Sequence, residues 1–177
     1  HIKTMLAMPR IRTLWEEKYG RPSGETDIDS LYQMFEGKLM SILENFTDIK
    51  PGVLETVKIL REKGISIGST TGYTDGMMEI VVKKAEEHGY KPDAWFSPDS
   101  TNKLGRPYPY MIYRNMEAFA VSSADGVVKV GDTVSDIMEG KSAGVFSIGI
   151  IEGSSEMGLS REEYDSLTGE EKSRRAV

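Results

Sequence analysis

Short apolar segments alternate with segments of helical periodicity from about residue 48 onward, and this alternation constrains the fold most strongly. Strands are expected at 65–70, 94–96, 127–130 and 146–151, and helices at 53–63, 74–89 and 109–120. A helix between two strands lets the second strand return parallel to the first through a right-handed crossover. The sequence therefore predicts an α/β protein with a mainly parallel sheet in residues 48–177.

The first 47 residues show a different pattern, because helical segments follow one another without a strand between them. Helices are expected at 8–20 and 29–46, the second with Asp29 or Ser30 at its start. Apolar residues of the second helix recur at helical spacing and form one face: Leu31, Met34, Phe35, Leu39, Ile42, Leu43 and Phe46. This face is either the core of a helical domain or a dimer surface. We expect two domains, at 1–47 and 48–177.

The composition excludes several classes of protein. The 177 residues include no cysteine, which excludes a disulfide scaffold and a cysteine-ligated zinc site. A net charge of −6 with acids and bases intermixed argues against a nucleic-acid surface. The apolar runs are too short to span a bilayer, and no secretory leader opens the chain. We therefore expect a cytoplasmic protein that binds neither nucleic acid nor membrane.

Polar residues follow the first expected strand, at the sheet edge where parallel sheets bind ligands. The strand runs into Thr71, Gly72 and Tyr73, and a helix begins directly afterwards. A hydroxyl group and backbone N–H groups at a helix N-terminus suit an anion, especially a phosphate. The simpler alternative is that Thr71 or Thr74 only caps the helix.

A basic loop follows the second expected strand. Arg106 lies between Gly105 and Pro107, which restricts the backbone around it, and Lys103 is close by in sequence. A guanidinium group held in a stiff turn suits phosphoryl oxygens. The alternative is an ordinary solvated arginine.

Two carboxylates four positions apart, Asp132 and Asp136, follow the third expected strand. Hard oxygen ligands grouped in this way suit Mg²⁺, which binds one or two carboxylates together with water and a substrate phosphate. The structural alternative makes Asp132 an N-cap and Asp136 a first-turn acid that is favoured by the helix dipole. Taken together, the three strand ends predict a site for a phosphate and a divalent cation.

These motifs, in this order, resemble the haloacid dehalogenase superfamily of phosphotransferases. Within it, GSTTGYT, GRPYPYM and KVGDTVSD resemble the phosphonoacetaldehyde hydrolase (phosphonatase) family, and the likeness extends from HIKTMLAMPRI to EGSSEMGLSREE. GRPYP is the most specific feature, since related phosphatases more often carry a lysine in a KPxP segment. The resemblance implies a Rossmann-like core of the haloacid dehalogenase type with a partial α-helical cap.

The resemblance also implies roles for single residues. Thr71, with Gly72, would hold the transferring phosphoryl group, and Arg106 would stabilise its charge. Asp132 would be a Mg²⁺ ligand, and Asp136 would order Mg²⁺-bound water or the metal shell.

Further roles concern the substrate and the cap. Tyr73 would line the substrate pocket, and His1 matches a cap histidine that is implicated in proton handling. The substrate would be the small molecule phosphonoacetaldehyde, which is cleaved to acetaldehyde and phosphate during phosphonate degradation. The family tends to dimerise through its cap, so we expect a homodimer.

Cleavage of a C–P bond requires two further residues. The expelled carbanion is stabilised if a cap lysine first forms a Schiff base with the aldehyde, and an aspartate nucleophile then becomes an aspartyl-phosphate. The one DxD sequence, Asp27-Ile28-Asp29, follows a polar turn and not a strand, so it is not the nucleophile. We expect both residues to precede residue 1, the chain to be truncated at both ends, and the fragment to be inactive alone.

Two other functions stay open from the sequence. A related phosphatase that acts on a phosphate ester would need no Schiff-base lysine. A non-catalytic relative would keep the fold without the nucleophile, although Thr71, Arg106, Asp132 and Asp136 together argue against it.

Overall fold

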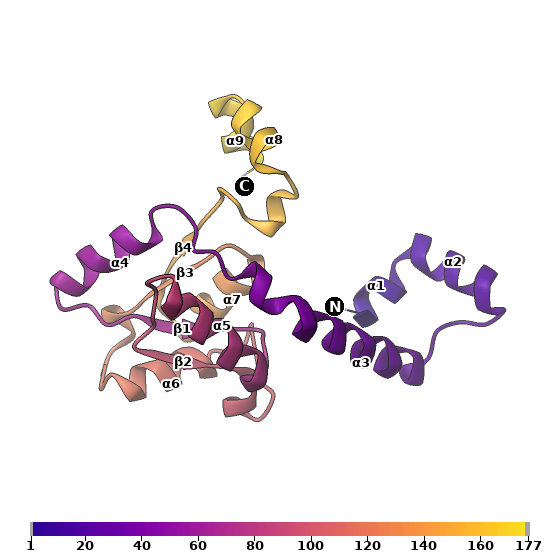
Figure 1. Cartoon of the computed structure of the whole chain (residues 1–177), viewed down its shortest axis with the longest axis horizontal. Coiled ribbons are helices and arrows are strands. Elements are labelled where there is room, and N and C mark those ends of the chain that lie inside the picture. Colours follow the sequence, from indigo (N-terminus) through magenta and orange to yellow (C-terminus); the bar gives the residue numbers. More distant parts are fainter. Residues whose placement is uncertain (1, 176–177) are drawn as a thin grey trace. The chain divides into compact units, whose positions relative to one another are not determined.

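The computed structural model of the chain describes residues 2–175 and divides into two compact units, His1–Asp48 and Ile49–Val177 (Figure 1). We call them the helical unit and the α/β unit. The helical unit contains α1 (Ile2–Ala7), α2 (Pro9–Tyr19) and α3 (Glu25–Ile42), followed by a 3-10 turn at Leu43–Phe46. The units meet one residue beyond the expected boundary, and the assignment of the first unit as a cap stays a prediction.

The α/β unit alternates strands and helices as the sequence pattern predicts. Its strands are β1 (Gly68–Thr70), β2 (Ala94–Phe96), β3 (Val128–Gly131) and β4 (Phe146–Gly149). Its helices are α4 (Val53–Glu62), α5 (Asp75–Glu87), α6 (Tyr110–Ala118), α7 (Val134–Ala143), α8 (Arg161–Ser166) and α9 (Gly169–Arg175). All four expected strands are present, although three of them differ from the expected bounds by one to three residues at an end.

The helix α3 begins earlier than expected. Its N-cap is Gly24, whose N–H group donates to Asp27 Oδ2 at 2.8 Å. Arg21 also donates to both oxygens of Asp27, at 2.6 and 2.7 Å. The expectation of a start at Asp29 or Ser30 is therefore wrong, because Asp27 and its partners fix the first turn one turn upstream.

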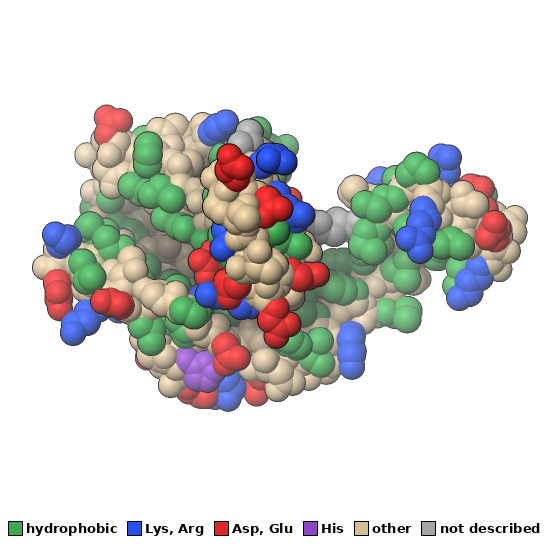
Figure 2. Space-filling view, turned by 90° about the horizontal axis from the view of Figure 1, so that it is seen from above, with side chains coloured by type: hydrophobic (Ala, Val, Ile, Leu, Met, Phe, Trp, Pro, Cys, Tyr) green, Lys and Arg blue, Asp and Glu red, His purple; other side chains and the backbone are tan. Residues whose placement is uncertain are grey.

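The apolar residues of α3 are largely exposed. Met34 is 71% exposed and Phe35 is 54% exposed, and α3 contributes no buried residue. Hydrophobic side chains are visible at the surface of the helical unit, at the right of Figure 2. Met34 and Phe35 of this face are therefore exposed in the described unit, whereas Leu43, directly after α3, is 2% exposed.

The strands pair in parallel, which confirms the expected sheet type. β1 pairs with β2, with Ser69 opposite Trp95, and β3 pairs with β4, with Lys129 opposite Ser147. Within the described residues these are two separate two-stranded ladders. Each parallel pair therefore consists of two consecutive strands with a helix between them in the sequence.

Helices α6 and α7 supply the core that lies against the strands. Ile112 of α6 packs in one buried cluster with Ala143 and Val145, which lie at the end of α7 and just after it. At Gly140 of α7, an added Cβ would lie 2.1 Å from Ser147 Oγ, so the helix approaches the strands closely there. The N-terminus of α7 lies at the carboxyl end of β3, because only Asp132 and Thr133 separate the two elements.

In residues 2–175, none of the helices combines the length and the apolar character that crossing a bilayer requires.

Gly68 of β1 offers a direct test of this packing. A Cβ added at Gly68 would lie 2.2 Å from Oδ1 and 2.7 Å from Cγ of Asn115, which is a buried residue of α6. We expect Gly68→Ala to lower the free energy of unfolding by about 1–3 kcal/mol, because the helix must shift to relieve the overlap. The measurement is urea denaturation followed by circular dichroism.

Gly76→Ala is the matched control, because no atom lies within 4 Å of the added methyl group in α5. It should leave the stability unchanged or slightly raise it. Equal unfolding midpoints for the two variants would contradict the packing of α6 against β1.

Candidate active site

The loop after β1 presents a hydroxyl group and a glycine at the sheet edge. Thr71 Oγ1 accepts a hydrogen bond from the Tyr73 N–H group at 3.1 Å, so the hydroxyl proton of Thr71 is left to donate to another group. Thr74 is the N-cap of α5 but makes no side-chain capping bond. The Asp75 N–H group is instead bound by Asp99 Oδ2 at 2.8 Å. The alternative that Thr74 is the N-cap of α5 is therefore confirmed by position, although the capping bond comes from Asp99 and not from the Thr74 side chain.

Arg106 lies between this loop and α7. Its Nη1 atom is 2.5 Å from Asp136 Oδ1, and the Arg106–Pro107 peptide bond is cis. A Cβ added at Gly72 would lie 3.1 Å from Arg106 Nη2. One edge of the guanidinium group thus binds Asp136, and the other lies beside the Thr71–Gly72 loop. The arginine side chain is 23% exposed, so solutes can reach it.

Asp136 is buried at the start of α7 and all its acceptor capacity is used. Oδ1 binds Arg106 and also Lys129 Nζ at 2.9 Å, while Oδ2 accepts from the Thr133 hydroxyl at 2.6 Å and its N–H group at 3.2 Å. Burial alone would raise the pKa of Asp136. Hydrogen bonds from Thr133 and Lys129 and the lysine charge outweigh burial and hold this pKa well below its ordinary value of 3.8.

The N-cap of α7 is Thr133, and Asp136 closes a capping box with it. The structural alternative that made Asp132 the N-cap is therefore wrong by one residue, whereas its placement of Asp136 in the first turn is confirmed. This cap uses only Oδ2 of Asp136, so the two cations at Oδ1 are not explained by helix capping.

Gly131 allows Asp136 to reach this position. A Cβ at Gly131, the last residue of β3, would lie 2.2 Å from Cβ and 2.4 Å from Cγ of Asp136. Only a residue without a side chain lets the strand end and the first turn of α7 approach so closely. The glycine of the KVGDTVSD segment is therefore required for steric reasons.

A second ion pair, which the sequence pattern did not predict, lies beside Asp136. Lys129 Nζ lies 2.9 Å from Glu139 Oε2 and 2.7 Å from Thr70 Oγ1. The Thr70 hydroxyl in turn donates to Glu139 Oε2 at 2.8 Å. Lys129 sits in the middle of the apolar strand sequence VVKV, and this position was the available signal for a buried charge.

Asp132 is the carboxylate that a metal ion could reach. Its side chain is 38% exposed, and the nearest cation is Lys50 Nζ at 4.0 Å. Asp136 has no lone pair left for a metal ion, since both oxygens are occupied. Among the described residues, no group of three histidines or acids could hold a metal ion. A Mg²⁺ ion therefore fits at Asp132 if water, substrate and residues outside the described range complete its shell.

The other predicted residues lie as follows. Tyr73 is 37% exposed beside Gly72, where it could border a ligand. His1 lies outside the described residues. Thr71, Gly72, Arg106 and Asp136 are brought together at the sheet edge.

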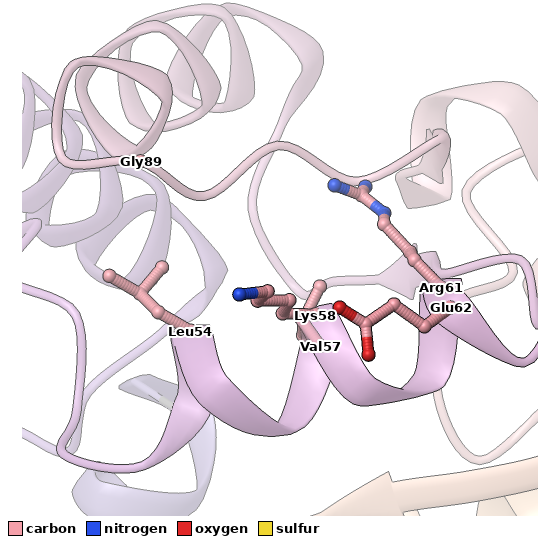
Figure 3. A pocket seen from close by; sticks show the side chains of 6 residues that line it. All are labelled: Leu54, Val57, Lys58, Arg61, Glu62 and Gly89. Carbon is pink, nitrogen blue, oxygen red and sulfur yellow. The ribbon is translucent and has the colours of Figure 1, made fainter.

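A pocket of about 420 Å³ lies elsewhere on the α/β unit, along α4. Figure 3 shows it lined by Leu54, Val57, Lys58, Arg61, Glu62 and Gly89, none of which is a predicted site residue. Arg61 already binds Asp93 at 3.0 Å. This pocket offers no arrangement of groups for phosphoryl chemistry.

Several known proteins resemble this chain over almost its whole length. The phosphonoacetaldehyde hydrolase of Lysinibacillus sphaericus is 54% identical over 171 residues, which are 97% of this chain and 64% of that protein. The phosphonoacetaldehyde hydrolase of Parabacteroides distasonis is 52% identical over the same shares of the two chains. The chain thus spans about 64% of the length of these relatives.

Solved structures show the same fold. The crystal structure of a phosphonoacetaldehyde hydrolase-like protein from Oleispira antarctica matches with a TM-score of 0.87 and 34% identity, over 99% of this chain and 63% of that one. A haloacid dehalogenase-like hydrolase from Bacteroides fragilis matches with a TM-score of 0.65 at 16% identity, over 94% of this chain and 74% of that one, which shows the fold alone. The haloacid dehalogenase-like hydrolase family matches residues 7–144, and the chain therefore belongs to this family of hydrolases.

Proposed function

We propose that this chain is part of an enzyme that hydrolyses the C–P bond of phosphonoacetaldehyde, giving acetaldehyde and phosphate. The observation that carries the proposal is the placement of Arg106, which binds Asp136 with one edge and lies beside the Thr71–Gly72 loop with the other. This arrangement suits a phosphoryl group. The relatives named phosphonoacetaldehyde hydrolase support the choice of substrate.

The residues of this chain would hold and neutralise the phosphoryl group. The Thr71 hydroxyl, whose oxygen accepts from the Tyr73 N–H group, would donate its proton to one phosphoryl oxygen. The guanidinium group of Arg106 would bind a second oxygen and stabilise the charge that develops during transfer. Asp132 would hold Mg²⁺, which supplies positive charge at the transferring group.

The proposed mechanism needs an aspartate nucleophile and a Schiff-base lysine. Attack on phosphorus breaks the C–P bond, and the electron pair of that bond passes into the protonated imine to give an enamine. The enamine carbon then takes up a proton to give an iminium ion, and one water releases acetaldehyde from the lysine while a second releases phosphate from the aspartyl group.

Neither of these residues is assigned within residues 1–177. Asp27 of the DxD sequence is bound to Arg21 and to the Gly24 N–H group, which argues against a nucleophilic role. We propose that the nucleophile and the lysine come from outside residues 1–177, and that the fragment alone is inactive.

We further propose that the enzyme is a homodimer whose interface includes the apolar face of α3. The exposure of Met34 and Phe35 supports this assignment, because clustered exposed apolar residues are typical of interaction surfaces.

The activity test uses the intact encoded polypeptide with Mg²⁺ and phosphonoacetaldehyde. Acetaldehyde and phosphate should appear together, and borohydride should trap a lysine adduct visible by mass spectrometry. Arg106→Lys should lower kcat by about 100-fold or more, because an ammonium group cannot bind Asp136 and a phosphoryl oxygen in the same fork geometry.

Arg114→Lys is the matched control, since Arg114 is an exposed arginine of α6 that pairs with Glu117. It should leave kcat unchanged. Release of phosphate from phosphate esters only, without an adduct, would replace the proposal with an ester phosphatase. A wild-type polypeptide that acts on neither kind of substrate would favour a non-catalytic relative.

The lowered pKa of Asp136 predicts how its variant depends on pH. Because the folded state lowers this pKa, the stabilisation is fully present above the ordinary value of 3.8 and is lost as the pH falls through the lower folded-state pKa. At pH 7, Asp136→Asn should lower the free energy of unfolding by about 3 kcal/mol, since Lys129 and Arg106 lose a buried counter-charge. Below pH 3.8 the difference from the wild type should shrink.

Urea denaturation at pH 7 and pH 3 checks this expectation. Asp165→Asn removes an exposed ion pair with Arg161 and should cost at most about 1 kcal/mol. A stability difference for Asp136→Asn that stays constant over this pH range would contradict the ion-pair assignment.

The dimer is tested by sedimentation velocity. Replacing Met34 and Phe35 together by glutamate should convert a wild-type dimer to monomers, because two charges would be buried in the interface. Gln33→Glu adds a charge at an exposed neighbouring position and should leave the dimer intact. A wild-type monomer, or a double variant that still dimerises, would refute the assignment of this face.

A further inference from the structure

Lys129 is a buried lysine that the proposed chemistry does not use. It is 9% exposed, and its Nζ atom has three acceptors, namely Asp136 Oδ1 at 2.9 Å, Glu139 Oε2 at 2.9 Å and Thr70 Oγ1 at 2.7 Å. Three acceptors match the three protons of an ammonium group. The charge of Lys129 is therefore held at a defined point directly beside Asp136.

Asp136 Oδ1 is shared by two cations. Arg106 Nη1 lies 2.5 Å from this oxygen and Lys129 Nζ lies 2.9 Å from it. The two cations differ in access, since the Lys129 side chain is 9% exposed and the Arg106 side chain is 23% exposed. Lys129 thus neutralises part of the carboxylate charge from inside the protein, while Arg106 binds from the solvent side.

We propose that Lys129 is a positioning residue that tunes Arg106 for the phosphoryl group by sharing Asp136 with it. With Lys129 present, Asp136 does not cancel the whole charge of Arg106, and the edge of the guanidinium group beside Gly72 keeps its attraction for an anion. Without Lys129, Arg106 is the only cation on Asp136 and binds a phosphoryl group less well. This inference rests on the proposed function, because it concerns the same phosphoryl site.

The charge of Glu139 should change phosphate affinity in the direction opposite to that of Lys129. It is fully buried, its Oε2 atom binds Lys129 and Thr70, and its Oε1 atom has no hydrogen-bond partner among the described residues. Its negative charge offsets that of Lys129. Removing this charge while keeping the shape of the side chain should leave Lys129 freer to neutralise Asp136, and phosphate affinity should rise.

The expected changes in phosphate affinity have opposite signs for variants of Lys129 and Glu139, and this distinguishes the proposal from a purely structural ion pair. If Lys129 and Glu139 only stabilise the fold, breaking the pair from either side should harm the protein in the same way. If Lys129 tunes Arg106, Lys129→Met and Glu139→Gln should shift phosphate affinity in opposite directions. Stability alone cannot reproduce that pattern.

The experiment is isothermal titration of the intact encoded polypeptide with inorganic phosphate in the presence of Mg²⁺. Lys129→Met should weaken phosphate binding about tenfold, and Glu139→Gln should strengthen it by roughly threefold. Lys129→Arg keeps the charge and should stay near the wild type. Lys141→Met, at an exposed lysine of α7, is the matched control and should change nothing.

A loss of affinity in both Lys129→Met and Glu139→Gln, or in neither, would overturn the proposal. Should Lys129→Met fail to fold, the double variant Lys129→Met/Glu139→Gln removes both buried charges. The double variant should bind phosphate about tenfold more weakly than Glu139→Gln alone. If the double variant also fails to fold, the change in phosphate affinity of Glu139→Gln alone is the test. Stronger binding supports the proposal, and weaker binding overturns it.

Turnover of phosphonoacetaldehyde by the wild type separates this inference from the proposed function. Phosphate binding with the expected opposite shifts but without C–P cleavage would reject the proposed substrate and keep the role of Lys129. Cleavage by the wild type together with an unchanged phosphate affinity in Lys129→Met would reject the role of Lys129 alone.

Discussion

The carboxylate of Asp136 is the point on which the candidate site depends. It joins the loop that carries Arg106 to β3 through Lys129, and it caps the first turn of α7 through Thr133. Isolated buried charges are costly, so each of these groups needs the others to remain charged inside the protein. The loop, the strand and the helix therefore hold one another in place through a single side chain.

Glycine residues make this arrangement sterically possible. Gly131 lets Asp136 lie against the end of β3, and Gly72 leaves room for the guanidinium group of Arg106. Gly140 likewise allows α7 to pack closely against Lys129 and Ser147. Absent side chains at three positions thus allow the charged side chains to converge.

The charge balance of the cluster has a consequence for ligand binding. Two cations and two carboxylates face one another, with Arg106 the most accessible of the four. An arriving phosphoryl group meets a guanidinium group whose partner carboxylate is already shared with Lys129. We infer that the inner ion pair influences the outer site, although Lys129 and Glu139 lie behind Asp136.

Much of the architecture followed from the sequence by itself, because periodicity and glycine placement act locally. Alternation of strands and helices predicted the parallel pairs, and the polar residues after each strand predicted the edge at which Thr71, Arg106 and Asp136 meet. The start of α3 differs from the prediction, because Arg21 and Gly24 both bind Asp27 through contacts that residue propensities do not include. Exposure of the α3 face was likewise undetermined, since an apolar stripe looks the same in a core and at a surface.

Only the tertiary structure decided how the charges are shared. From the sequence, Asp132 and Asp136 were two similar acids near a strand end. In the fold, Asp132 is half-exposed and available to a cation, whereas Asp136 is enclosed by Arg106, Lys129 and Thr133. The difference arises because burial and the directions of side chains depend on contacts between segments far apart in the chain, and a local pattern contains no information about those contacts.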